Sequence, residues 1–185
     1  MATAIHMTIQ DLEGLPTPLD DQRYEIIDGD LFVSKQPHWH HQLAATNIIA
    51  ILWTWNRESG GGIVVDAPGV IFANDTAVAP DVVWVSAERL DALLGEDGKL
   101  HAAPDLVVEL LSPGAENERR DGETKLDLYS RQGVREYWIV DWQHRELHIH
   151  RRRGARLELI ATLLANDVLE SPLLPGFAVQ ISEFF

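Results

Sequence analysis

The chain has 185 residues, of which 45% are hydrophobic and 24% are charged, and these proportions predict a globular protein with residues 1–185 in one domain. The absence of cysteine excludes disulfide frameworks and thiolate zinc sites, and a formal net charge of −14 argues against a protein that binds duplex DNA through a broad cationic surface. No basic leader precedes an apolar core at the N-terminus, and the longest apolar stretch, residues 43–55, is too short to span a bilayer, so we expect a cytoplasmic protein without a membrane partner.

The first third of the chain predicts a short helix, a hairpin and a long helix. The short helix follows Thr8, which is a favourable N-cap residue. Two extended runs flank Asp28-Gly29, a sequence typical of a tight hairpin turn, and Glu25 alternates with Ile27 on the first run. Glu25 is therefore a candidate to point inward beside apolar neighbours. Apolar residues at helical spacing then predict an amphipathic helix over residues 37–57.

The rest of the chain alternates short apolar runs with helical segments. Asp81 stands at the start of one run, and the run 106–111 lies between two prolines and is typical of a strand buried on both faces. Asp121 is expected to cap a helix that ends near Gln132. Further strands are expected at residues 62–65, 69–73, 136–141, 146–150 and 157–164, before an apolar tail at residues 173–185 that packs on the body or on another subunit.

Glu109 is the exceptional residue of the apolar run 106–111. Burying an unpaired charge costs several kcal/mol, so this carboxyl group is expected to be protonated, paired or bound to a cation. Asp81, at the mouth of another apolar strand, is a candidate neighbouring carboxylate, and Lys125 is a candidate cationic partner. Two acids and a lysine at the ends of buried strands predict a divalent-metal site for phosphodiester chemistry. A buried structural ion pair between Glu109 and Lys125 is the alternative.

Several motifs together resemble the Uma-type family of putative restriction endonucleases, within the PD-(D/E)XK nuclease superfamily. The resemblance covers nearly the whole chain from residue 20 onward, and it rests on the joint order of five segments: Tyr24 to Gly29, Pro80 to Val82, Pro104 to Pro113, Asp121 with Lys125 and Tyr129, and Gly133 to Asp141. It implies an α/β fold with a restriction-endonuclease-like αβββαβ core. In such a fold a mixed central sheet is flanked by helices, here with an N-terminal hairpin and C-terminal antiparallel strands.

The resemblance also implies a metal site. Asp81 and Glu109 would bind Mg²⁺ or Mn²⁺, with the backbone carbonyl of Leu110 as a further ligand. The superfamily pattern places a lysine two residues after the strand acid, where this chain has Leu111. Lys125, on the following helix, is the candidate replacement. It would orient or deprotonate the attacking water, or stabilise the transition state.

Other residues compete for places in this site. A second Pro-Asp pair contains Asp105, which lies four residues before Glu109 on one strand and therefore roughly 13 Å away, so Asp81 is preferred. Glu25 would be a further metal ligand or a supporting acid. His41 is the histidine expected to face the site. The remaining histidines of the two clusters are His38, His40, His148 and His150. They are expected to be exposed, with transition-metal binding by either cluster as the alternative.

The resulting hypothesis is a metal-dependent endonuclease that cleaves DNA and forms a homo-oligomer, most simply a dimer. Arg119 and Arg120 are candidate phosphate contacts in an otherwise acidic chain. A catalytically idle nuclease-like scaffold, which dimerises or binds a protein, is the first alternative, and it draws support from the net charge and from Leu111. A hydrolase of small phosphoesters, which needs no large basic surface, is the second.

Overall fold

A six-stranded mixed sheet forms the centre of the fold, in the order β10-β9-β8-β7-β6-β3. The structure, a computed structural model, describes residues 6–15, 22–114, 117 and 119–185. Within the sheet β7 and β8 run parallel, and the other neighbours are antiparallel. The strands are β3 (Gly62–Asp66), β6 (Val82–Ser86), β7 (Leu106–Leu110), β8 (Glu136–Asp141), β9 (Glu146–Arg153) and β10 (Arg156–Leu164).

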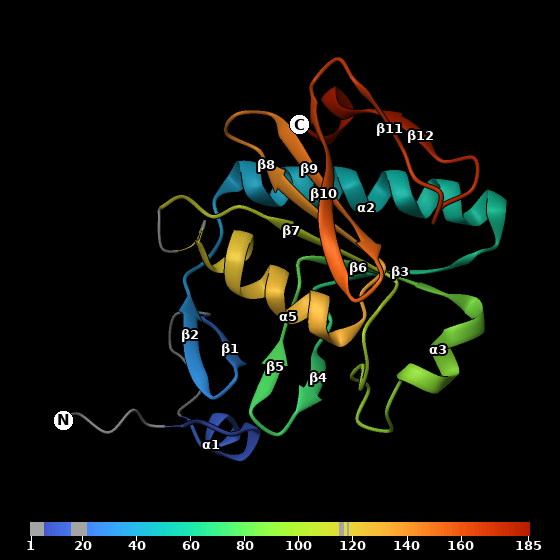
Figure 1. Cartoon of the computed structure of the whole chain (residues 1–185). Coiled ribbons are helices and arrows are strands. Elements are labelled where there is room, and N and C mark those ends of the chain that lie inside the picture. The colour runs from blue at the N-terminus through green and yellow to red at the C-terminus, as the bar shows by residue number, and fades with distance from the viewer. Residues whose placement is uncertain (1–5, 16–21, 115–116, 118) are drawn as a thin grey trace.

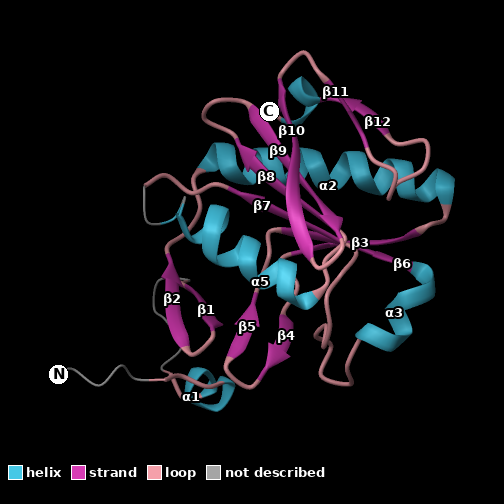
Figure 2. Cartoon of the chain, in the orientation of Figure 1, coloured by secondary structure: helices cyan, strands magenta, loops and turns pink. Residues whose placement is uncertain are grey.

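Helices cover both faces of this sheet, as Figures 1 and 2 show. The long helix α2 (Trp39–Ser59) lies along one face and α5 (Lys125–Gln132) along the other. Because successive side chains of a strand point to opposite faces, the central strands are apolar throughout. Val82 and Val108 pack in the α2 core, whereas Val83 and Val107 pack in the α5 core.

A smaller four-stranded sheet, in the order β2-β1-β5-β4, lies beside the central sheet. It joins the hairpin β1 (Arg23–Ile27) and β2 (Asp30–Ser34) to the hairpin β4 (Val70–Ala73) and β5 (Thr76–Val78). The first turn has positive φ at both central residues, 52° at Asp28 and 84° at Gly29, which is the backbone geometry of a type I′ hairpin. This hairpin carries Glu25 toward the end of β7.

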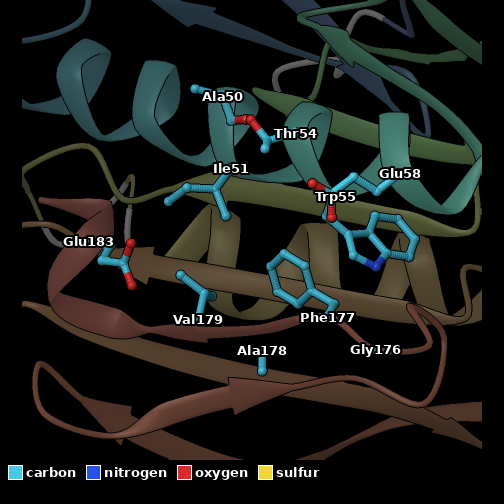
Figure 3. Close-up of a pocket in the computed structure, with 10 residues that line it drawn as sticks. All are labelled: Ala50, Ile51, Thr54, Trp55, Glu58, Gly176, Phe177, Ala178, Val179 and Glu183. Atoms are coloured by element: carbon cyan, nitrogen blue, oxygen red, sulfur yellow. The ribbon is translucent and has the colours of Figure 1, made fainter.

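The C-terminal segment packs across α2. It contains β11 (Val168–Glu170), β12 (Ala178–Gln180) and the 3₁₀ turn η2 (Ile181–Phe184). Phe177 and Phe184 contact Trp138 of β8, so the apolar tail lies on the body of the same chain. A groove of about 430 Å³ remains between α2 and β12, with Ile51, Trp55, Phe177 and Val179 facing it (Figure 3).

The predicted αβββαβ core is confirmed as α2, β3, β6, β7, α5 and β8 in chain order. The other helices are the short α1 (Ile9–Glu13), which Thr8 caps, and α3 (Ala87–Leu93). Among the helices of the described residues, none is long and apolar enough to cross a bilayer. The expected cap at Asp121 is wrong, because this residue lies buried inside a π-helical turn, η1 (Arg120–Thr124), that continues into α5.

The Asp105 side chain is engaged in structural contacts. Its fully buried carboxylate accepts hydrogen bonds from the Ser86 backbone N–H at 2.9 Å and from Arg89 at 2.6 Å. Arg135 lies 3.0 Å away on the same oxygen. The Asp105 side chain therefore ties α3 and the approach to β8 to the start of β7.

We expect Asp105→Ala to lower the free energy of unfolding by about 3 kcal/mol, because it removes the acceptor of a buried ion pair. Urea denaturation measures the change. Asp91→Ala, at an exposed position of α3, is the matched control and should shift stability by less than about 0.5 kcal/mol. Equal stability of the two variants would contradict this role.

Candidate active site

The predicted site residues line one small cavity of about 110 Å³ at the carboxyl end of β7. The four principal side chains come from four different places in the sequence. β1 provides Glu25, the residue before β6 is Asp81, β7 provides Glu109, and Lys125 is the first residue of α5. The remaining lining residues are Arg23, Ser34, Lys35, Pro37, His41, Leu110, Ser112 and Arg120.

Strand register places the two principal acids on one face of the sheet. Val82 pairs with Val108 in the antiparallel β6–β7 ladder, so Asp81 and Glu109 are the next residues to face each other. Each acid lies two positions along its strand from a valine of the α5 core. Both carboxylates therefore point to the α5 side of the sheet, where Lys125 is located.

Lys125 connects three acidic side chains in the interior. Its Nζ lies 2.8 Å from Glu109 Oε1, 3.1 Å from Glu25 Oε1 and 4.0 Å from Asp121 Oδ1. The Tyr129 hydroxyl, one turn further along α5, donates a second hydrogen bond to Glu109 Oε1 at 2.8 Å. The ammonium group beside Glu109 thus comes from α5, whereas Leu111 stands two residues after this acid in the sequence.

The Leu110 peptide is held from both sides. Its N–H donates to Asp81 Oδ2 at 2.9 Å, and its carbonyl lies 3.1 Å from His41 Nε2. His41 Nε2 is also 3.4 Å from Asp81 Oδ2, so this buried histidine of α2 does face the site. The Leu110 carbonyl has a second lone pair available beyond its contact with His41.

The electrostatics of the cavity separate the two acids. Burial would raise the pKa of Asp81, but hydrogen bonds from His41 and Leu110 and the charges of His41 and Lys125 lower it to about 2. Burial raises the pKa of Glu109 to about 8, which the Lys125 charge opposes and the charges of Asp81 and Glu25 reinforce. Although burial disfavours the charged form of Lys125, the surrounding acids raise its pKa further above the ordinary value. The two acids therefore differ at neutral pH, because Asp81 is ionised whereas Glu109 in the metal-free cavity is largely protonated.

Two arginines complete the cavity, and the sequence pointed to only one of them. Arg120 is buried, donates to Asp121 at 3.0 Å and to Ser34 at 2.9 Å, and lines the cavity, whereas Arg119 is exposed. Arg23 Nη1 lies 3.2 Å from Asp81 Oδ1 and was not predicted. Period-two alternation on β1 places Arg23 on the same face as Glu25, and this is the signal that could have found it.

The histidine prediction needs one correction. His38 and His40 are exposed and His148 is half-buried, but His150 is buried against Tyr137 with a ring distance of 6.0 Å. His150 lies on β9, where its side chain faces the α5 core rather than solvent. Alternation along β9 places His148 and His150 on the same face of the strand. It does not indicate which of the two is buried by the core.

The donor set fits a hard divalent cation. Asp81, Glu109 and the Leu110 carbonyl offer the oxygen ligands that Mg²⁺ and Mn²⁺ prefer. Among the described residues no three His, Asp or Glu side chains are grouped closely enough to enclose a metal ion by themselves. Mg²⁺ commonly uses only one or two carboxylates and completes its octahedron with water and substrate phosphate, so a two-acid site is compatible with it.

Comparisons with known proteins identify the family and the fold. The model of the Uma2 family, described as "Putative restriction endonuclease", matches residues 9–182. The fold is similar to the crystal structure of a putative nuclease belonging to DUF820 from Anabaena variabilis, with a TM-score of 0.76, 16% sequence identity and 97% of each chain covered. A search of curated proteins gives no match to this chain.

We expect the stability of the metal-free protein to fall with rising pH because of Glu109. Its pKa is raised from 4.5 to about 8 in the folded state, so its contribution is fully present below pH 4.5 and is lost as the pH rises through 8. The wild type should lose up to about 1.4 kcal/mol per pH unit relative to Glu109→Gln within this window. Urea denaturation of both proteins across the window measures the difference, and a difference that is constant with pH would contradict the assignment.

Proposed function

Because this chain belongs to the Uma2 family of putative restriction endonucleases, we propose that it is a metal-dependent endonuclease that hydrolyses phosphodiester bonds in DNA. The observation that carries the proposal is the contact of Lys125 with Glu109, on the sheet face that Asp81 shares. An acid pair that can hold a divalent ion, beside an ammonium group, can support attack by water on a phosphodiester. A nuclease family and a nuclease-like fold support the substrate class.

Asp81 and Glu109 would hold the Mg²⁺ or Mn²⁺ ion, with the Leu110 carbonyl as a third ligand. A bound divalent ion lowers the pKa of its water and offsets charge on the reacting phosphate. The charge of a bound cation would also oppose the burial and the neighbouring acids that raise the pKa of Glu109. Glu25 accepts the Ala79 N–H at 2.9 Å and contacts Lys125, which supports a positioning role beside the two ligands.

Lys125 would act as a cation rather than as a base. Its raised pKa keeps the ammonium group protonated at neutral pH, so it does not abstract a proton from water. A charged donor held by Glu109 and Glu25 is already oriented, so it can stabilise negative charge on a phosphate oxygen without reorganisation. Arg23 and Arg120, also at the cavity, would hold the flanking phosphate groups.

Small phosphoesters are the second candidate substrates. The cavity of about 110 Å³ and the net charge of −14 favour a compact substrate over a long duplex. A catalytically idle scaffold is the third candidate, and the charged groups retained in the cavity count against it. The proposed endonuclease is a homodimer that acts in the cytoplasm.

Metal binding should stabilise the fold. Millimolar Mn²⁺ or Mg²⁺ should raise the free energy of unfolding by about 1–3 kcal/mol, because the ion binds the folded site and hardly the unfolded chain. The Asp81→Asn/Glu109→Gln variant should lose this response. Thermal melts with and without metal measure it, with Glu88→Gln/Asp91→Asn, two exposed acids of α3, as the matched control. A full response in the cavity variant would move the metal site elsewhere.

DNA cleavage should depend on the same groups. Supercoiled plasmid incubated with Mn²⁺ and pure protein should be nicked, and Lys125→Met should lower the rate by about 10²–10³-fold, as for other lost transition-state donors. Methionine is preferred to alanine because Lys125 is buried and its stem fills core space. Asp81→Asn should abolish nicking.

Lys99→Met is the matched control for the nicking assay, since Lys99 lies outside this cavity. Nicking that persists equally in Lys125→Met and Asp81→Asn would reveal a contaminating nuclease. Absence of nicking across many substrates by a protein that binds metal would favour the small phosphoesters or the idle scaffold.

A further inference from the structure

A second cavity lies beside the candidate active site and is walled by flat side chains. It has a volume of about 510 Å³ and is lined by His40, Leu43, Trp142, Gln143, Arg145 and Phe185. Trp142 connects it to the site, because its indole N–H donates to the Leu111 carbonyl at 2.9 Å, two residues beyond Glu109. Two residues of strand span about 7 Å, so the two cavities are close neighbours at one edge of the sheet.

The walls of this cavity are organised before any ligand arrives. His38 stacks on Trp142 with ring centroids 5.0 Å apart and an interplanar angle of 8°, and His40 lies 5.9 Å from the same indole. The turn that follows Trp142 is fixed by Asp141, whose carboxylate accepts the N–H groups of Gln143 and His144, both at 3.0 Å. The Arg145 guanidinium lies 5.5 Å from the centre of the Phe185 ring.

The chemistry of the walls selects a planar ligand that is neutral or negatively charged. Aromatic and imidazole rings offer stacking surfaces, Gln143 offers both a donor and an acceptor, and Arg145 offers a cation. In a chain with 29 acidic residues, none of the described residues that line this cavity carries a carboxylate side chain. A nucleobase with its phosphate has this combination of a flat face, a hydrogen-bonding edge and a negative charge.

We propose that this cavity binds an unpaired nucleobase of the DNA substrate. This base would lie one nucleotide along the DNA strand from the phosphate group at Glu109. The inference rests on the proposed function and adds the form of the substrate. A base inside a duplex is covered by its neighbours, so only an unpaired or flipped base presents its face to Trp142. A few stacked bases also suit an acidic protein better than a long array of phosphate contacts.

The test compares binding of two fluorescent probes by anisotropy, a short oligothymidylate and a blunt DNA hairpin. Ca²⁺, which takes oxygen ligands, replaces Mn²⁺ in the buffer. Trp142→Leu should weaken oligothymidylate binding by roughly 5- to 100-fold, the range for loss of one stacked base. Trp142→Phe should restore most of the affinity, and hairpin binding should change less than oligothymidylate binding.

Trp53→Leu is the matched control, because Trp53 is an exposed tryptophan of the same helix α2 as His40, with Arg57 4.8 Å from its ring, and lies outside the cavity. It should leave both affinities unchanged. The double variant His40→Ala/Arg145→Ala should weaken oligothymidylate binding and serves in place of Trp142→Leu if thermal melts show that the leucine variant does not fold. Equal oligothymidylate affinity in the wild type and in the folded cavity variant overturns the proposal, as does the absence of wild-type binding.

The outcome separates this inference from the proposed function. Plasmid nicking together with unchanged oligothymidylate binding in the cavity variants would overturn the base site and leave the endonuclease. Loss of oligothymidylate binding in the cavity variants by a protein that never nicks DNA would support the base site and overturn the endonuclease.

Discussion

The buried contact between Lys125 and Glu109 is the interaction on which the rest of the site depends. It joins the first residue of α5 to the penultimate residue of β7, so it fixes the start of the helix against the carboxyl end of the strand. An unpartnered carboxylate at the Glu109 position would cost several kcal/mol. The same contact draws in Glu25 from the smaller sheet, and one ammonium group thereby holds three parts of the chain together.

The charge distribution gives the cavity a character unlike that of the surface. The whole chain carries a net charge of −14, yet Arg23, Arg120 and Lys125 converge on a single small cavity. Their charges act at short range and in surroundings of low polarity, where they count for more than charges on the surface. An acidic surface is therefore compatible with the phosphate binding proposed for this cavity, provided that few phosphate groups need to be contacted at once.

Much of the site was accessible from the sequence, because its strongest signal is local. A carboxylate within the apolar run of β7 is costly in any fold, so Glu109 stood out before its partners were known. Asp28-Gly29 likewise specified its own turn. Sequence patterns did not find Arg23, whose meaning depends on which face β1 presents, or the π-helical turn that buries Asp121 instead of leaving it as a cap. Such features arise from tertiary packing, which overrides local preference.

The assembly of this site from distant segments has a consequence for folding. Lys125 and Glu25 are a hundred positions apart in the chain, and Asp81 comes from a third segment between them. Contacts between remote segments form only after the cost of closing the intervening loops has been met, which makes them late and cooperative. A partly folded intermediate would contain helices and local hairpins but no assembled cavity. The candidate active site is therefore complete only when the native topology is complete.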